Sequence, residues 1–189
     1  MVTGAAGQLG SCIVNGLIDS NARVVATDTT IDILEKSAER WEWNKSKVIL
    51  KECDITKRED IVAAIEEGIA VYGGITALVA NAGVSVFEPY LERPEESIDW
   101  VMDINLKGTL LCIQEFIKHR KENEGGGSIV NIGSHYGLVS PDMRIYTDSG
   151  RNSSEIYGAT KAGIIQMTRY FAVHAAKHGI RTNTVSPGG

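Results

Sequence analysis

The sequence has few cysteines, no excess of positive charge and no long hydrophobic run. Cys12, Cys53 and Cys112 are odd in number and far apart, which excludes a disulfide framework and indicates reduced thiols in a cytoplasmic protein. The net charge of −5 argues against nucleic acid or an anionic membrane as the main partner. No apolar run approaches the length of a membrane-spanning helix, and no secretory signal is visible. Cysteine and histidine spacings typical of metal sites are also missing, so we expect no metal.

Strands and helices alternate along the 189 residues, a length that suits one domain. Apolar runs that read as strands are followed by helical patterns, with candidate strands at 22–27, 48–53, 75–80, 128–132 and 181–185. Such alternation predicts a parallel sheet with helices on both faces. The expected fold is therefore a doubly wound, Rossmann-like α/β domain of three layers, α/β/α.

The predicted helices cover about 8–20, 30–43, 56–72, 97–121 and 155–177. Thr56 and Glu59 are predicted to form a capping box at the start of the third. Polar residues or glycines follow the predicted strands, namely Gly4, Asp28, Asp54, Asn81, Ser134 and Pro187-Gly188. Because ligands bind beyond the carboxyl ends of such strands, we expect these residues to gather at one edge of the sheet.

Three glycines, Gly4, Gly7 and Gly10, join the first predicted strand to the first helix. Gly4 would allow a tight turn, Gly7 a close approach of a pyrophosphate to the backbone, and Gly10 close packing of helix on strand. The helix N-terminus would then face the anion. This spacing favours a dinucleotide phosphate site over a plain turn between strand and helix.

Asp28 lies 18 residues after Gly10 (28 − 10), at the end of the next strand. A carboxylate there can accept hydrogen bonds from both hydroxyls of an adenosine ribose, and it would repel a 2′-phosphate. No basic residue lies within 29–31, so the sequence predicts NAD rather than NADP. Asp54 ends the following strand, where it could contact the adenine or merely start a turn.

Tyr157 and Lys161 lie four positions apart in the predicted helix 155–177. Positions i and i+4 share a helix face, so a phenol and an ammonium would lie side by side. A neighbouring cation stabilises a deprotonated phenol, which suits proton transfer. The spacing alone also occurs as an accidental surface pair, so its interpretation depends on the rest of the chain.

In their order and spacing these motifs resemble those of the short-chain dehydrogenase/reductase family, in its single-domain branch. The resemblance covers almost all 189 residues and rests on the glycine loop, 53–56, Asn81-Ala82-Gly83, 104–108 around Asn105, Ser134, Tyr157 with Lys161, and 181–188. It implies a catalytic tetrad of Asn105, Ser134, Tyr157 and Lys161. It also implies that NAD is bound by Gly4, Gly7, Leu9, Gly10, Asp28, Asp54, Ile55, Asn81, Ala82, Gly83, Tyr157, Lys161, Pro187 and Gly188.

The resemblance also implies roles and an activity. Tyr157 would exchange a proton with the substrate oxygen during hydride transfer, and Ser134 would hydrogen-bond that oxygen. Lys161 would bind the nicotinamide ribose, and Asn105 would anchor a water that connects Lys161 to solvent. The implied activity is NAD(H)-dependent interconversion of a secondary alcohol and a ketone. Two alternatives stay open: a nucleotide-sugar epimerase or dehydratase with tightly held NAD, favoured by glycines spaced 3 and 3, and a non-catalytic dinucleotide-binding protein.

Ser134 and Tyr157 are 23 residues apart (157 − 134), longer than is usual in the family. The segment 135–154 between them is either a solvated loop or a cover over the substrate, with Arg144 or Arg151 pairing a carboxylate or phosphate. Its beginning resembles a bacterial subgroup linked to flagellin modification and nonulosonic-acid sugars. That similarity implies a small-molecule substrate that is polar or derived from a sugar.

Both ends look shortened relative to the family. Only Met1-Val2 precede the glycine loop, so we expect a short first strand. We also expect the substrate-covering segment after Pro187-Gly188 to be absent and the activity of residues 1–189 alone to be weak. The resemblance implies a homodimer or homotetramer joined through the two long helices, where Ala159, Ala162 and Gly163 would permit close packing.

Overall fold

The computed structural model describes residues 1–123, 125–146 and 153–188. Six parallel strands form one sheet in the order β3-β2-β1-β4-β5-β6. They are β1 Val2–Thr3, β2 Val24–Asp28, β3 Val48–Glu52, β4 Ala77–Ala80, β5 Gly127–Ile132 and β6 Ile180–Val185. The predicted doubly wound α/β fold is therefore confirmed.

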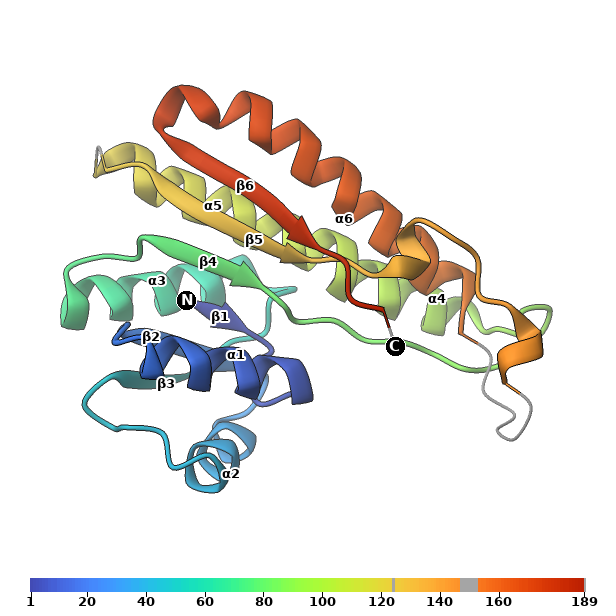
Figure 1. Ribbon diagram of the computed structural model, residues 1–189, viewed down its shortest axis with the longest axis horizontal. Coiled ribbons are helices and arrows are strands. Elements are labelled where there is room, and N and C mark those ends of the chain that lie inside the picture. Colours follow the sequence, from blue (N-terminus) through green and yellow to red (C-terminus); the bar gives the residue numbers. More distant parts are fainter. Residues whose placement is uncertain (124, 147–152, 189) are drawn as a thin grey trace.

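The main helices are α1 Gln8–Asp19, α2 Ile31–Arg40, α3 Arg58–Tyr72, α4 Glu95–Val101, α5 Thr109–Glu122 and α6 Glu155–His174. Helices α1 and α2 cover one face of the sheet, and α3, α5 and α6 cover the other (Figure 1). The strand order reverses between β1 and β4, whose carboxyl ends diverge toward different helices. Ligands of doubly wound sheets bind at this reversal.

Side chains of the central strands alternate between two apolar clusters. Val24 and Ala26 point toward α1 and α2, whereas Val25 between them joins the cluster under α3 and α5. Both clusters are fully buried at their centres, with Val14 in the first and Phe116 in the second at 0% and 1% exposure. This alternation follows from the two-residue period of a strand, and it explains why the sheet needs helices on both faces.

The predicted capping box is wrong. Helix α3 begins at Arg58, and its preceding residue, Lys57, caps no backbone group with its side chain. The Thr56 hydroxyl instead donates to Asp54 Oδ1 at 2.7 Å. Asp54 lies closer to that hydroxyl than any helical N–H does, because both residues belong to one tight turn after β3.

The long helix predicted at 97–121 is confirmed in its extent, but it is not α-helical throughout. The chain forms α4, then a π-helical turn over Met102–Gly108, then α5. Gly108 ends that turn against the Ile55 side chain, where an added Cβ would lie 2.7 Å from Ile55 Cδ1. Wide turns of this kind occur mostly at functional sites, and this one turns Asn105 inward to complete burial.

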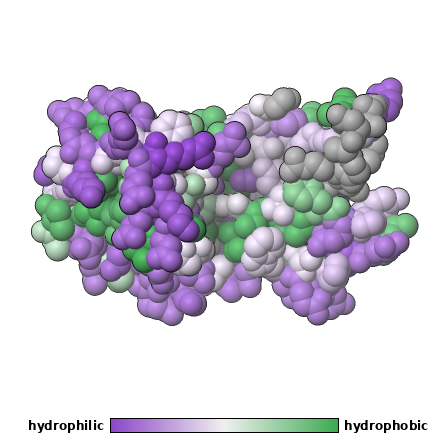
Figure 2. All heavy atoms as spheres, turned by 90° about the horizontal axis from the view of Figure 1, so that it is seen from below, coloured by the Kyte–Doolittle hydropathy of each residue, from purple (hydrophilic) through white to green (hydrophobic). Residues whose placement is uncertain are grey.

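Cys53 and Cys112 are buried free thiols, as expected, whereas Cys12 is exposed. Within the described residues, no helix has the length and apolarity needed to cross a membrane, and no cluster of metal-ligating side chains occurs. Figure 2 shows hydrophilic residues over much of one face, with hydrophobic residues visible among them, including near its middle.

Candidate active site

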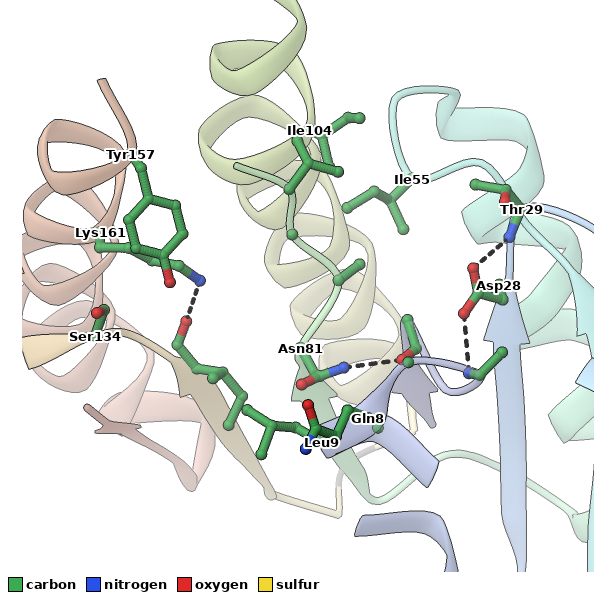
Figure 3. A pocket seen from close by; sticks show the side chains of 18 of the residues that line it. Gln8, Leu9, Asp28, Thr29, Ile55, Asn81, Ile104, Ser134, Tyr157 and Lys161 are labelled. Atoms are coloured by element: carbon green, nitrogen blue, oxygen red, sulfur yellow. Dashed lines mark hydrogen bonds between the residues drawn. The ribbon is translucent and has the colours of Figure 1, made fainter. Parts of the chain in front are cut away.

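A cleft of about 760 Å³ opens where β1, β2, β4 and β5 end. Figure 3 shows Ser134, Tyr157 and Lys161 on one side of it and Asp28 on the opposite side. Of the expected site residues, the cleft is lined by Gly4, Gly7, Leu9, Gly10, Asp28, Asp54, Ile55, Asn81, Ala82, Gly83, Ser134, Tyr157, Lys161 and Pro187. Segments far apart in the sequence thus form one concave surface, of the size that small-molecule sites usually have.

The glycine loop leads from β1 into the first turn of α1. Gly4 has a φ of +62°, and a Cβ there would lie 2.7 Å from Ala82 Cα. Gly10 lies so close to the strand that a Cβ would be 2.0 Å from the Gly4 carbonyl oxygen. The tight loop leaves the N-terminus of α1, at Gln8 and Leu9, facing the cleft. Backbone N–H groups and the helix dipole there favour an anionic ligand.

Asp28 ends β2 and is half-buried at the edge of the cleft. Its Oδ2 accepts the Ala6 backbone N–H at 2.9 Å, and its Oδ1 accepts that of Thr29 at 2.9 Å (Figure 3). Each carboxylate oxygen retains a second lone pair. Asp28 therefore holds the glycine loop to β2 and can still accept hydrogen bonds from a ligand.

Asn81, one of the residues expected to bind NAD, holds the glycine loop in place. Its Nδ2 donates to the carbonyl oxygens of Thr3 and Gly4, both at 3.0 Å. The Thr3 hydroxyl in turn accepts the backbone N–H groups of Asn81 and Ala82, both at 3.1 Å. The ends of β1 and β4 are thereby tied together across the point where the strand order reverses.

Asp54 starts the turn after β3 and also lines the cleft. Its Oδ1 accepts both the backbone N–H and the hydroxyl of Thr56, at 3.0 and 2.7 Å. Burial opposes ionisation, but the hydrogen bonds from Thr56 and the charge of Lys57 outweigh it and lower the pKa of Asp54. The structure thus shows Asp54 starting a turn, which was one of the two uses considered for it. Its neighbour Ile55 lines the cleft with an apolar side chain.

Ser134 and Tyr157 are both fixed by local hydrogen bonds. Ser134 Oγ accepts the backbone N–H of Tyr136 at 3.1 Å, which leaves the hydroxyl proton of Ser134 able to point elsewhere. Ser154 caps α6 by accepting the backbone N–H of Tyr157 at 3.2 Å. The carbonyl of Tyr157 accepts the Thr160 hydroxyl at 2.8 Å. These bonds orient the first turn of the helix that carries the phenol.

Lys161 is 3% exposed, and its Nζ donates to the Ile132 carbonyl oxygen at 2.7 Å. Burial lowers the pKa of this ammonium from 10.5 to about 8. Nζ lies 5.6 Å from the centroid of the Tyr157 ring. The predicted phenol–ammonium pair is therefore present on one helix face, and its charge is held in a poorly solvated position.

Lys161→Met is expected to raise the free energy of unfolding at pH 7 by about 1–3 kcal/mol, because it removes a desolvated charge. The gain should be full below pH 8, where both folded and unfolded chains carry the proton. It should fade as the pH rises from about 8 to 10.5, where only the unfolded chain still binds it. Urea unfolding at several pH values checks this, with exposed Lys107→Met as control; equal or lower stability at pH 7 contradicts it.

Asn105 is fully buried in the π-helical turn. Its Oδ1 accepts the Val84 backbone N–H at 2.8 Å, and its Nδ2 donates to the Val84 carbonyl at 2.9 Å and to Thr160 Oγ1 at 3.2 Å. The side chain thus clamps the segment after Gly83 onto α6. A Cβ on Gly83 would lie 3.3 Å from Asn105 Oδ1 and 3.5 Å from Lys161 Nζ, so Gly83 keeps these groups close.

Pro187 lines the cleft, but Gly188 does not and is exposed. The Pro187 carbonyl accepts the backbone N–H of His135 at 3.0 Å and lies 3.1 Å from His135 Nδ1, which must carry the proton in that contact. The segment after β6 is thereby tied to the one after β5. Gly188 is one residue too far along to face the cleft.

The segment 135–154 is only partly within the described residues, and Arg151 lies outside them. Arg144 binds both carboxylate oxygens of Asp142 through Nε at 3.0 Å, and its side chain is 90% exposed. The hydroxyls of Tyr136 and Tyr146 are hydrogen-bonded to each other. Arg144 is therefore already paired with a carboxylate of its own chain.

Some lining residues carry no polar signal in the sequence, namely Val84, Trp100, Ile104, Ile132 and Gly133. Ile104 lies in the π-helical turn and Trp100 in the last turn of α4, and both line the cleft. The heptapeptide 102–108 holds only one glycine and no proline, so the sequence predicts an ordinary α-helix there and gives no sign of the wider turn. Ile132 and Gly133 directly precede Ser134, and their position at a strand end is the one available clue.

Comparison with known proteins agrees with this geometry. The family model for short chain dehydrogenase matches residues 1–189. An NAD-dependent glycerol dehydrogenase of Listeria innocua is 33% identical over 99% of this chain and 68% of its own. A short chain dehydrogenase of Leptospira borgpetersenii with bound NAD⁺ is 37% identical, with a TM-score of 0.86 over 100% of this chain and 69% of its own.

An NAD⁺-bound xylitol dehydrogenase is 26% identical, with a TM-score of 0.87 over 99% of this chain and 68% of its own. The chain thus spans a little over two thirds of the length of each of these relatives. Because the family model covers every residue and the cleft joins a glycine loop to a Ser-Tyr-Lys cluster, the chain belongs to the short-chain dehydrogenase/reductase family.

Proposed function

We propose that this protein is an NAD(H)-dependent oxidoreductase that interconverts a secondary alcohol and a ketone, with Tyr157 as the proton donor and acceptor. One observation carries the proposal. A single cleft joins the glycine loop and Asp28 to Ser134, Tyr157 and Lys161. The first two suit a dinucleotide, and the last three suit proton transfer at an alcohol or ketone oxygen.

The residues of the cleft fit a dinucleotide along its whole length. The free lone pairs of Asp28 suit the hydroxyls of the adenosine ribose, and the first turn of α1 suits the pyrophosphate. Ile55 and Asp54 border the adenine end. Lys161 has one N–H on Ile132 and two left for the nicotinamide ribose. The carboxylate at position 28 favours NAD over NADP, as the sequence predicts.

When bound, the nicotinamide supplies or accepts the hydride. In ketone reduction the Tyr157 hydroxyl donates its proton to the substrate oxygen, and in alcohol oxidation the phenolate takes that proton back. Ser134, whose oxygen already accepts from Tyr136, donates its own hydrogen to the same substrate oxygen. Each group thus acts on the atom whose charge changes during the reaction.

Lys161 stabilises the phenolate form of Tyr157 through its charge. Its Nζ lies 5.6 Å from the centroid of the Tyr157 ring, on the same side of the cleft. Asn105 holds Val84 and Thr160 in place beside this pair. The backbone of the π-helical turn around Asn105 is the proposed anchor for the water that links Lys161 to solvent.

A neutral polyol or sugar is the proposed substrate class. Two of the relatives are named for glycerol and for xylitol, which are both neutral polyols. Arg144 is already paired with Asp142, so its guanidinium is not free to bind a carboxylate or phosphate of a substrate. Hydroxyl-rich substrates also suit a cleft whose polar side chains are mostly neutral donors and acceptors.

The purified chain is expected to form NADH from NAD⁺ with glycerol, xylitol or a related polyol, and to do so far more slowly with NADP⁺. NADH absorbance measures the rate, and a β-ketoacyl thioester with NADH serves as the competing substrate class. Turnover of the thioester alone would contradict the polyol assignment. Retained NAD without net NADH formation would instead favour the epimerase or dehydratase alternative, to which the glycine spacing points.

Association of two copies through α5 and α6 is part of the proposal. Tyr170 and Val173 on α6 are 54% and 72% exposed, and Ala159 and Ala162 are exposed on the same helix. Gly163, in contrast, packs within the chain, since a Cβ there would lie 2.7 Å from Leu106 Cδ1. Gly163 therefore serves the contact with the π-helical turn rather than a contact with a partner.

A further inference from the structure

Arg93 is a buried cation that lies outside the cleft described above. It belongs to the segment between β4 and α4, and its side chain is 1% exposed. Arginine is rarely buried this fully unless its donors are all engaged. Its partners therefore indicate what it holds together.

The guanidinium of Arg93 joins two carboxylates from distant parts of the chain. Nε and Nη2 donate to the two oxygens of Glu155 at 2.9 and 3.1 Å, which is a bidentate pair. Nη1 donates to Glu88 Oε2, and Nη2 also donates to the Glu88 backbone carbonyl at 2.9 Å. Glu88 Oε1 accepts the Ser97 hydroxyl of α4 at 2.8 Å. We call Arg93, Glu88 and Glu155 the arginine cluster.

The arginine cluster is attached to the first turn of the catalytic helix. Glu155 is the first residue of α6, and Tyr157 follows two positions later. Ser154 caps the helix just before Glu155. The start of α6 is thus held by one cap within the local chain and by one ion pair that reaches 62 positions back along the sequence.

The segment 84–93 is held at both ends. At its start the Asn105 amide binds both backbone groups of Val84, and at its end Arg93 binds Glu155. Asn105 also contacts Thr160 of α6, so both attachments lead to the same helix. This segment is therefore attached to the beginning of α6 on both sides of Tyr157, at Glu155 and at Thr160.

We propose that Arg93 is a positioning residue that sets the place of the Tyr157 phenol through its bidentate pair with Glu155. This inference rests on the proposed function, because it assigns Arg93 a part in the same proton transfer. Catalytic groups need placement to within about 0.5 Å, and an error of 1 Å can cost about 100-fold in rate. A planar fork with fixed donors supplies such placement, whereas a lysine in its place would offer a single point charge.

Kinetics of four variants test the proposal. Arg93→Ala is expected to lower kcat by about 10- to 100-fold with little change in the Kd for NADH, since the cluster lies outside the dinucleotide cleft. Arg93→Lys should recover only part of that loss, and Glu155→Gln, which keeps the shape of the side chain, should fall between. Arg169→Ala removes an exposed arginine from α6, the helix of Glu155 and Tyr157. It is the matched control, and its kcat is expected to equal that of the wild type.

Coupling between the two partners gives a second kinetic test. If Arg93 acts through Glu155, the double variant Arg93→Ala/Glu155→Ala should lose no more kcat than Arg93→Ala alone. Multiplied losses would mean that Arg93 acts by another route and would overturn the proposal. Wild-type kcat in folded Arg93→Ala or Arg93→Lys would overturn it as well.

A spectroscopic test separates this inference from the proposed function. In a chain labelled with carbon-13 at tyrosine Cζ, the Tyr157 resonance is identified by its loss in Tyr157→Phe. It is expected to shift or broaden in Arg93→Lys and Glu155→Gln and to stay in place in Arg169→Ala. If the wild type turns over no substrate, the proposed function fails while this shift still supports the positioning role. An unmoved Tyr157 resonance in both variants overturns the positioning role, whatever the activity.

Discussion

Replacing Tyr157 with phenylalanine is expected to lower kcat by about 10²- to 10⁴-fold while NADH binding stays nearly unchanged. The change removes one oxygen and leaves the ring, the helix cap on Ser154 and the burial of Lys161 intact. The lost rate is the contribution of proton transfer to the substrate oxygen. NADH oxidation with a saturating ketone measures kcat, and quenching of protein fluorescence by NADH measures binding.

Tyr170→Phe is the matched control for this experiment. Tyr170 lies on the same helix, is 54% exposed, packs edge-on against Phe171 and does not line the cleft. Its variant should keep wild-type kcat. Full turnover in Tyr157→Phe would remove the phenol from the mechanism. Binding of NADH without turnover in the wild type as well as in the variant would instead favour the non-catalytic dinucleotide-binding alternative. Loss of NADH binding together with turnover would instead show that the phenol oxygen holds the cofactor.

Gly10→Ala is expected to impair both folding and cofactor binding through a single methyl group. The new Cβ would lie 2.0 Å from the Gly4 carbonyl oxygen and 2.9 Å from Ala5 Cα. These neighbours are backbone atoms, so the clash can be relieved only by moving α1 away from β1. Overpacking of this kind costs typically 1–3 kcal/mol, and here it also displaces the N–H groups in the first turn of α1, which we propose as the pyrophosphate site. We expect at least a 10-fold weaker Kd for NADH.

Gly16→Ala makes the same chemical change six positions later in the same helix. Apart from its chain neighbours and the backbone of its own helix, no atom lies within 4 Å of the position its Cβ would take. Because alanine is the better helix former, this variant should gain about 0.5–1 kcal/mol in unfolding free energy and bind NADH as the wild type does. Urea unfolding and NADH titration of both variants decide the matter. Equal effects of the two substitutions would refute the close contact between α1 and the glycine loop.

The layer architecture follows from patterns that are local in the sequence. Apolar runs such as 48–53 and 128–132 are too short for helices, and each is followed by a helical pattern, so parallel strands with crossover helices were the only consistent arrangement. Boundaries were less predictable. Ile75 belongs to an apolar run, yet β4 begins at Ala77, because strand ends depend on the neighbour with which they pair.

The site was predictable where one residue type performs one task. Gly4 and Gly10 were identified because no other residue fits the space that each occupies. The contacts of Asn81 and Arg93 could not be predicted from the sequence. Asn81 bonds to Thr3, 78 positions away, and Arg93 bonds to Glu155, 62 positions away. An amide or a guanidinium has the same appearance in the sequence whether it meets a ligand or a distant stretch of backbone. Only the fold decides between these uses.

The hydrogen bonds between Thr3 and Asn81 also bear on the order of events during folding. They join positions 78 residues apart, and β1, with only two residues, lies between β2 and β4. Contacts so distant along the chain close late, because the entropy of the loop between them must be overcome first. We therefore expect the glycine loop to take its final shape after β1 has paired with both β2 and β4. We then expect a chain in which β1 has not yet met β4 to lack a complete surface for a dinucleotide.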